Sequence, residues 1–302
     1  MTQRKSKFGV FIAGLALIVV LGGCAGVSAP DTGQPQSSPF KHIHGLAVDG
    51  SAGYGLAATH AGLYRFSLTG TTALTPAQVG EPQGAIRDDF MGLTSFGGSL
   101  FASGHPHSAE NASSPNLGLR LSRDAGVTWE SVSGTSAADY HALTVGADDG
   151  GQEVIYGLDS GSNAISSSVD GGRSWMKGAA LAALNIAADP ALPKTVYATT
   201  QSGVQVSRDS AQSFALLPET PVLYLLTAIP DPSIGSLIGV DVDGTVWLKP
   251  ATQPWKKTGK VTGKAHAIAF ASTADPVLLV SDQSGIALSR DLGATWRVVV
   301  TP

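Results

Sequence analysis

The chain has 302 residues, a formal net charge of −4 at pH 7 and one cysteine. A single cysteine excludes an intrachain disulfide. The acidic balance argues against nucleic acid or an anionic membrane surface as the main partner. The length exceeds that of a usual single-core domain, but a repeat architecture divides its core among its units, so one domain is enough.

The first residues have the layout of an export signal. Three basic residues among the first seven precede an uninterrupted apolar run over 8–21, which ends in Leu-Gly-Gly-Cys24. A run of about 14 residues is too short to span a bilayer as a stable helix. It is typical of a secretory signal peptide, which we place at residues 1–23. An ordinary signal peptide cut near Ala29, which would discard the cysteine, is the alternative.

The segment Leu21-Gly-Gly-Cys24 resembles the bacterial lipobox. The resemblance implies cleavage before Cys24 and attachment of diacylglycerol to its sulfur, which would anchor an exported, extracytoplasmic domain to the bacterial cell membrane. It also accounts for an unpaired thiol in an exported protein. Residues 24–39 are rich in Gly, Ser, Pro, Gln and Ala, the composition of a flexible tether. The mature chain then carries sixteen basic against twenty-three acidic residues.

Residues 40–302 carry a repeat of strand-like segments. Apolar segments of similar pattern begin near His42, Phe90, Tyr140, Ala183, Leu223 and Ala265. Successive starts lie about 40 to 50 residues apart, the length of a propeller blade of four strands. We therefore predict an all-β fold, a six-bladed β-propeller in which each blade supplies its own four strands. Two points stay open: a seventh, irregular blade, and whether Ser38–Lys41 add to the last blade to close the ring.

One turn motif, S-x-D-x-G-x-[ST]-aromatic, recurs four times before the fourth strand of a blade. The copies contain Asp124 and Trp129, Asp170 and Trp175, Asp209 and Phe214, and Asp291 and Trp296. The third copy has lost its Gly. An Asp followed two residues later by Gly between β-rich runs indicates a hairpin, and the aromatic ring then covers the turn. We interpret these residues as structural and name the four copies the box turns.

The motif resembles the Asp box, or BNR repeat, of sialidases, sortilin-type receptors and related β-propellers. Together with the lipobox, it makes the chain similar to bacterial exported propeller lipoproteins of a glycosyl-hydrolase-like or sortilin-like type. The resemblance covers nearly all of residues 40–302 and implies the propeller fold. Because such propellers include enzymes, receptors and assembly factors, it implies no single function. The Phe/Tyr-Arg-Ile-Pro motif and the three converging arginines of a sialidase are not matched, so no catalytic residue is carried over.

Strand connectivity predicts that all seven histidines lie on one face of the propeller. In each blade, the inner strand starts on the face where the loop between the second and third strands emerges, whereas the box turn lies on the opposite face. Starts of inner strands carry His42, His44, His141 and His266, and loops after second strands carry His60, His105 and His107. This face is therefore our candidate ligand face.

The two His-x-His pairs favour a metal as the ligand. Residues two apart on a strand point to one side, so His42 and His44 would face the central channel and bind one ion. Imidazole suits zinc, copper, nickel or iron, and we take copper or zinc as the candidate ion. The candidate ligands are His42, His44, His60, His105, His141 and His266. The competing interpretation is that these histidines hydrogen-bond the backbone at loop ends or are solvated, and His107 is set aside as a bystander.

Carboxylates are expected on the same face. Asp159, Asp241 and Asp282 are predicted to occupy the loop position that histidines hold in the first two blades, and Asp89 and Asp139 precede inner strands. Asp89, Asp139 and Asp159 are the candidates for a catalytic acid and base.

Three functions remain for the predicted domain. The first is a surface-anchored propeller that binds a ligand, with a transition metal as the sharpest candidate. The second is a glycosidase-like hydrolase of envelope or host glycans, and the third is a scaffold that holds an exported protein. We predict the first, and we expect no typical sialidase activity.

Overall fold

The computed structural model describes residues 38–49, 53–108, 113–132, 138–231, 233, 236–273 and 275–302. They belong to one compact unit, Ser37–Pro302. The predicted signal peptide, Cys24 and most of the predicted tether lie outside the described residues. Within the described ranges, no helix combines the length and the apolar character that crossing a membrane requires.

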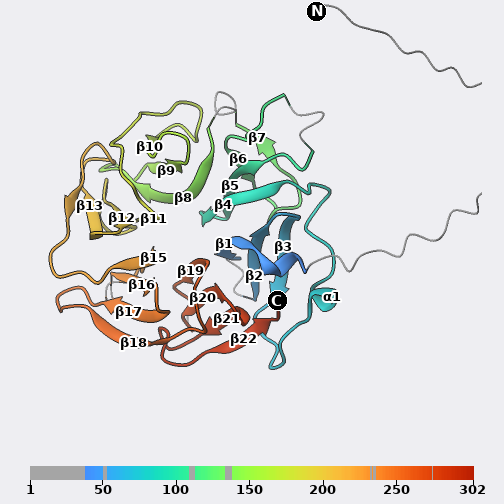
Figure 1. Cartoon of the computed structure of the whole chain (residues 1–302). Helices are drawn as coiled ribbons and strands as arrows, with labels where there is room; N and C mark the ends of the chain where they lie inside the picture. The colour runs from blue at the N-terminus through green and yellow to red at the C-terminus, as the bar shows by residue number, and fades with distance from the viewer. Residues whose placement is uncertain are drawn as a thin grey trace, which may run out of the picture. The chain divides into compact units, whose positions relative to one another are not determined.

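The predicted six-bladed β-propeller is confirmed: six small antiparallel sheets surround a central channel (Figure 1). Blade 1 contains β1 (Ile43–Val48), β2 (Tyr54–Thr59) and β3 (Gly62–Ser67). Blade 2 contains β4 (Asp89–Phe96), β5 (Ser99–His105), β6 (Arg120–Ser122) and β7 (Glu130–Ser131). Blade 3 contains β8 (Tyr140–Ala147), β9 (Glu153–Asp159) and β10 (Ile165–Ser168). Blade 4 contains β11 (Asn185–Ala188), β12 (Val196–Thr200), β13 (Gly203–Ser207) and β14 (Ala215–Leu216). Blade 5 contains β15 (Leu223–Ala228), β16 (Leu237–Asp241), β17 (Thr245–Lys249) and β18 (Lys256–Lys260). Blade 6 contains β19 (Ala267–Ala271), β20 (Val277–Asp282), β21 (Gly285–Ser289) and β22 (Arg297–Val300). Two short helices, η1 (Pro39–Lys41) and α1 (Pro76–Val79), lie outside the sheets. Each inner strand begins within two residues of its expected start.

The hydrophobic core is divided among the blades. The described residues form six buried clusters, and each is built from the facing surfaces of two adjacent blades, including the cluster that joins blade 6 back to blade 1. This division explains how a chain of this length folds as one unit, because no single cluster has to grow with the chain.

Two sheets have three strands instead of the predicted four. In blade 3, the outer segment is joined only by isolated bridges, such as that between Ser167 and Met176. In blade 1, the segment after β3 leaves its own sheet, and Leu74 pairs in parallel with Val300 of β22. This contact between a segment near the start of the propeller and its last strand closes the ring.

Residues Ser38–Lys41 add no strand to the last blade. Pro39 has no backbone N–H to donate to a neighbouring strand, and the segment turns as η1 instead. Phe40 packs on Tyr64 with ring centroids 5.0 Å apart, inside the cluster between blades 1 and 6. The segment therefore supports ring closure through its side chain.

Each box turn is held together by its own serine and aspartate. In the second copy, Ser168 Oγ accepts the Gly172 N–H at 2.9 Å and donates to Asp170 Oδ1 at 2.8 Å. Asp170 also accepts the backbone N–H of Ser174 at 2.9 Å and its hydroxyl at 2.5 Å. These hydrogen bonds, with that of the Ser174 hydroxyl first, lower the pKa of Asp170 to about 2. The same contacts recur at Asp124, Asp209 and Asp291.

The glycine of the box turn lies against the preceding blade. A Cβ atom on Gly126 would lie 2.2 Å from Leu63 of blade 1, and one on Gly172 would lie 2.2 Å from Leu119 of blade 2. In the third copy, Ala211 replaces the glycine, keeps a positive φ of 67° and is fully buried. The indole N–H donates to the carbonyl of the turn glycine at Trp129, Trp175 and Trp296. In the blades that carry them, the box turns therefore fasten the blade to the one before it.

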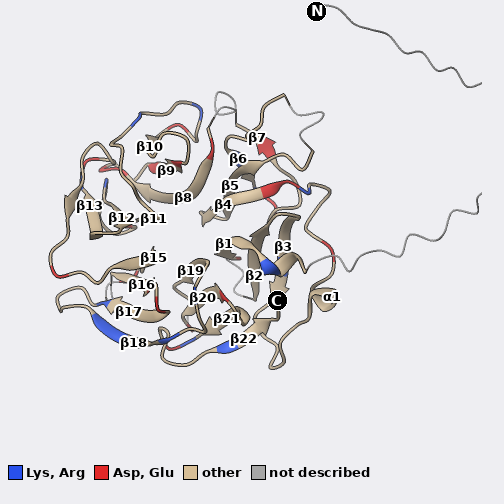
Figure 2. Ribbon diagram, in the orientation of Figure 1, with Lys and Arg blue, Asp and Glu red and all other residues tan. Residues whose placement is uncertain are grey.

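Basic residues mark the outer edge of blade 5. Strand β18 carries Lys256, Lys257 and Lys260, which Figure 2 shows as a blue stretch on the outside of the ring. Lysine on an outermost strand discourages pairing with the edge of another sheet. We assign these lysines to protection of that edge.

Candidate metal centres

Bulges near the start of the inner strands set the geometry of the candidate site. The register shifts by one residue in β1, β4 and β8, and the residues inside these bulges are His44, Met91 and His141. A bulge re-aims a side chain and breaks the alternation of a strand. The alternation that predicted His42 and His44 on one side of β1 therefore does not hold.

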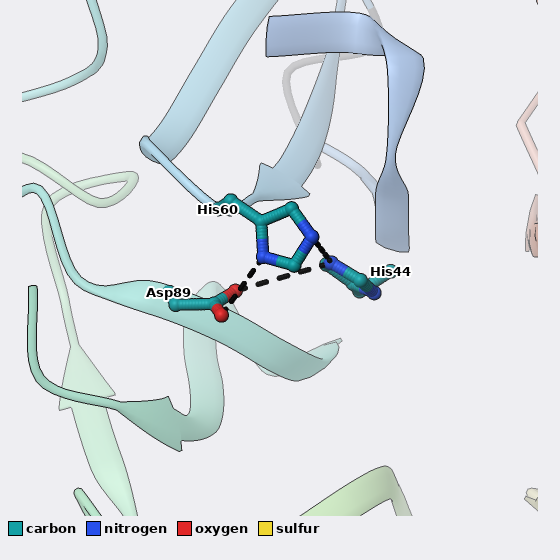
Figure 3. A group of neighbouring side chains, drawn as sticks. All are labelled: His44, His60 and Asp89. Carbon is teal, nitrogen blue, oxygen red and sulfur yellow. Dashed lines mark hydrogen bonds and ion pairs between the residues drawn. The ribbon is translucent and has the colours of Figure 1, made fainter.

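The first cluster, group 1, consists of His44, His60 and Asp89 and joins blade 1 to blade 2 (Figure 3). His44 Nε2 lies 3.2 Å from His60 Nε2 and 3.9 Å from Asp89 Oδ1. His60 Nδ1 lies 2.8 Å from Asp89 Oδ2. Because an ionised carboxylate only accepts hydrogen bonds, His60 carries its proton on Nδ1. The lone pair of His60 Nε2 then faces His44.

The second cluster, group 2, consists of His105, Asp139 and His141 and joins blade 2 to blade 3. Asp139 Oδ1 lies 3.1 Å from His141 Nε2 and 3.7 Å from His105 Nε2. His105 Nδ1 lies 3.2 Å from the carbonyl oxygen of Pro115, which can only accept a hydrogen bond. His105 therefore carries its proton on Nδ1, and the lone pair of its Nε2 faces Asp139.

One carboxylate oxygen in each group is buried and unsatisfied. Asp89 Oδ1 and Asp139 Oδ1 have no hydrogen-bond partner among the described residues. Leaving a buried acceptor unpaired costs about 1–3 kcal/mol. In a tetrahedral site with metal–ligand bonds of about 2.0–2.1 Å, neighbouring ligand atoms lie about 3.3 Å apart. The distance between the two Nε2 atoms of group 1 is 3.2 Å, and the shorter distance from Asp139 Oδ1 to an imidazole nitrogen in group 2 is 3.1 Å. Both groups therefore have the donor set and the spacing to hold a metal ion.

The electrostatics of group 1 keep an imidazole neutral. Burial, followed by the nearby His60, lowers the pKa of His44 to about 4, against the opposing effect of Asp89. His44 is thus uncharged at pH 7. In the metal-free chain its Nε2–H donates to His60 Nε2 at 3.2 Å, so the proton would move to Nδ1 when Nε2 binds a metal. Burial and then Lys264 lower the pKa of His266 in the same direction.

Three of the predicted histidines lie outside both groups. His42 is exposed, and its ring centroid lies 5.6 Å from that of His60. His266 lines the central channel, and His107 is exposed. Each predicted His-x-His pair is therefore split, with one member inside a group and the other outside.

The predicted loop position of Asp159, Asp241 and Asp282 is wrong by one residue. Asp282 is the last residue of β20 before the turn, and Thr59 is the last residue of β2 before the equivalent turn in blade 1. The three aspartates therefore align with Thr59 and not with His60. Each of the three carboxylates accepts three hydrogen bonds from neighbouring residues. They cap turns, which leaves little capacity for an external ligand.

Asp159 also positions group 2, together with a residue that the sequence did not single out. Asp159 Oδ1 accepts the backbone N–H of Asp139 at 3.2 Å. Ser160 donates its hydroxyl to Asp139 Oδ2 and its backbone N–H to the Asp139 carbonyl. Asp139 Oδ2 is therefore occupied while Oδ1 faces the imidazoles. Ser160 follows Asp159, the last residue of the second strand in blade 3, and His60 follows Thr59, the last residue of the second strand in blade 1. Aligning the ends of the second strands would therefore have pointed to Ser160.

Comparisons with known proteins support the fold alone. No protein-family model matches this chain, and no curated protein matches it. A chain in the crystal structure of a nidogen/laminin complex aligns with a TM-score of 0.58 and 15% identity, over 82% of this chain and 93% of that chain. The GH74 xyloglucanase from Xanthomonas campestris aligns with a TM-score of 0.49 and 15% identity, over 84% of this chain and 44% of its own length. YCF48 bound to D1 peptide aligns with a TM-score of 0.48 and 14% identity, over 85% of this chain and 80% of that chain.

Proposed function

We propose that this chain is an exported propeller, anchored through a lipid on Cys24, that binds copper or zinc in groups 1 and 2. The observation that carries the proposal is Asp139 Oδ1, a buried carboxylate oxygen that makes no hydrogen bond among the described residues and lies 3.1 Å from His141 Nε2 and 3.7 Å from His105 Nε2. Asp89 Oδ1 repeats it one blade earlier. A cation between the nitrogens and the oxygen would satisfy all of these atoms at once.

The donor set favours an ion that can exchange. Two histidines and one carboxylate leave a fourth position open in tetrahedral zinc coordination, whereas structural zinc sites are closed by four protein ligands. The imidazoles of His60, His105 and His141 are also partly exposed to solvent. We therefore assign the groups to uptake, storage or delivery of a metal ion outside the cell membrane.

The test is the metal content of the untagged full chain in detergent after dialysis against zinc or copper. We expect two ions per chain in the wild type and one in His105→Ala. The matched control is His107→Ala, which removes an exposed imidazole next to the site and should keep two. A wild-type chain that binds neither ion would refute the proposal, and equal loss in both variants would refute the assignment to group 2.

The alternative, a glycoside hydrolase of envelope or host glycans, has less support from the geometry. It needs two available carboxylates, but Asp89 and Asp139 face imidazoles and Asp159 already accepts three hydrogen bonds. We expect no turnover of a panel of aryl glycosides. A role as a scaffold for an exported protein is compatible with metal binding and is not favoured by a separate observation.

A further inference from the structure

The repeat of the propeller relates the two metal groups residue by residue. Asp89 and Asp139 occupy the same place in successive blades, because each lies two residues before the bulge residue of its inner strand. The bulge residue after Asp139 is His141, a member of group 2. The bulge residue after Asp89 is Met91.

The histidines from the turns are equivalent as well. His60 and His105 each come from the end of the second strand of one blade and approach the carboxylate of the next blade. His60 Nδ1 lies 2.8 Å from Asp89, and His105 Nε2 lies 3.7 Å from Asp139. With the turn histidines and the carboxylates matched, Met91 takes the place in group 1 that His141 takes in group 2. The same shift by one blade gives Met91 the place in group 2 that His44 takes in group 1, so its position relative to the carboxylates has to decide between the groups.

Met91 also lies in the right part of the molecule. It lines the central channel together with His44 and His141, and it is partly buried. The ring of His44, from blade 1, reaches across to Asp89 in the strand that carries Met91. Met91 lies two residues from Asp89 on β4, and at the same spacing in the next blade His141 Nε2 lies 3.1 Å from Asp139, which favours group 1 as the site that Met91 completes.

We propose that Met91 is the fourth ligand of group 1 and makes it a copper site, whereas group 2 remains a three-ligand site. This inference rests on the proposed metal-binding function. A thioether is a soft ligand that binds Cu(I) and adds little to zinc affinity, whereas imidazole suits both metals. The two groups then differ in selectivity: group 1, with two imidazoles, one carboxylate and one thioether, prefers copper, and group 2 accepts zinc or Cu(II).

The experiment compares Met91→Leu with the wild type in the full chain. Leucine nearly conserves the volume of methionine and removes only the sulfur. Cu(I) is titrated without oxygen against a coloured Cu(I) chelator, and zinc is titrated separately. The matched control is Met176→Leu, because Met176 is 53% exposed in another part of the propeller.

We expect Met91→Leu to lower the affinity for one of the bound Cu(I) ions at least about tenfold and to leave the number of bound zinc ions unchanged. Met176→Leu should change neither quantity. Met91→His, which copies the residue of group 2, should raise the zinc affinity of group 1. Unchanged Cu(I) affinity in Met91→Leu, in a chain that still binds two ions, would overturn this inference and leave the proposed function standing. Absence of copper and zinc binding by the wild type would instead overturn the proposed function itself.

Discussion

The aspartates of the box turns and those of the metal groups belong to the same residue type but meet opposite surroundings. Asp170 receives hydrogen bonds from two serines and from the backbone of its own turn, and its pKa falls to about 2. Asp89 and Asp139 each keep one buried oxygen without a donor among the described residues. A carboxylate that its own loop satisfies builds the fold, whereas one left unsatisfied beside imidazoles is available to a ligand.

This contrast predicts that substitutions in the two regions change different properties. A change at a metal group should alter metal binding with little effect on the stability of the metal-free chain. A change at a box turn should do the reverse, because its hydrogen bonds are local and already complete.

The largest effect is expected from Asp139→Ala. Deleting the carboxylate removes a ligand of group 2, so the affinity of one ion should fall at least about 100-fold, measured by competition with a chelator. The free energy of unfolding of the metal-free chain should change little, because the unpaired Oδ1 is removed together with the hydrogen bond that Oδ2 accepts from Ser160. A marked loss of stability without metal, together with unchanged metal affinity, would place Asp139 among the structural aspartates.

The next effect is expected from Ser168→Ala in the second box turn. Ser168 is buried, and its hydroxyl accepts the Gly172 N–H, which would be left unpaired. The free energy of unfolding, measured with urea, should fall by about 1–3 kcal/mol, and two ions should still bind. The matched control is Ser160→Ala at the rim of group 2, which should lower metal affinity and leave stability unchanged.

Acid should weaken the box turns at a pH below that of metal release. The pKa of Asp170 is lowered to about 2, first by the Ser174 hydroxyl, and that of Asp124 is lowered, first by the Thr128 hydroxyl. A lowered carboxyl pKa stabilises the folded chain above the unfolded-state value of about 4 and loses this effect as the pH falls toward 2. Urea unfolding of the metal-free chain between pH 5 and pH 2 should show this decline. Metal should leave earlier, as protons compete for the imidazoles, and stability that is flat down to pH 2 would contradict the assignment of the box turns.

The smallest effect is expected from Asp159→Asn. This residue does not belong to either group, but it accepts the backbone N–H of Asp139. Losing its charge should weaken the support of group 2 and lower metal affinity about tenfold, as outer-shell changes do. Asp282→Asn is the matched control, because that aspartate caps an equivalent turn in blade 6, away from both groups. An equal effect of both variants would show that the turn, and not the contact with Asp139, matters.

Much of the fold was predictable, because its signals are local. The starts of the six inner strands and the four box turns are each encoded within a few neighbouring residues, and the structure has the predicted starts within two residues. Ring closure was not predictable, since the contact between Leu74 and Val300 joins segments from opposite ends of the propeller.

The candidate site was predicted in part. The residue types and their gathering on one set of loops were visible, but the pairing of His44 with His60 was not, because a bulge in β1 turns His44 away from the alternation of an ideal strand. The aspartates that cap turns were misplaced by one residue for a similar reason: the sequence pattern does not define the end of a strand that closely. Met91 went unnoticed because its meaning depends on alignment with His141 across two bulges.

Anomalous diffraction from crystals of the protein soaked separately in zinc and copper tests the central claim most directly. We predict two peaks per chain, one beside Asp89 Oδ1 and His44 Nε2, and one between Asp139 Oδ1 and the imidazoles of His105 and His141. The account would be contradicted if neither metal gave an anomalous signal at these places. Ordered water molecules or direct hydrogen bonds from the imidazoles would then satisfy Asp89 Oδ1 and Asp139 Oδ1.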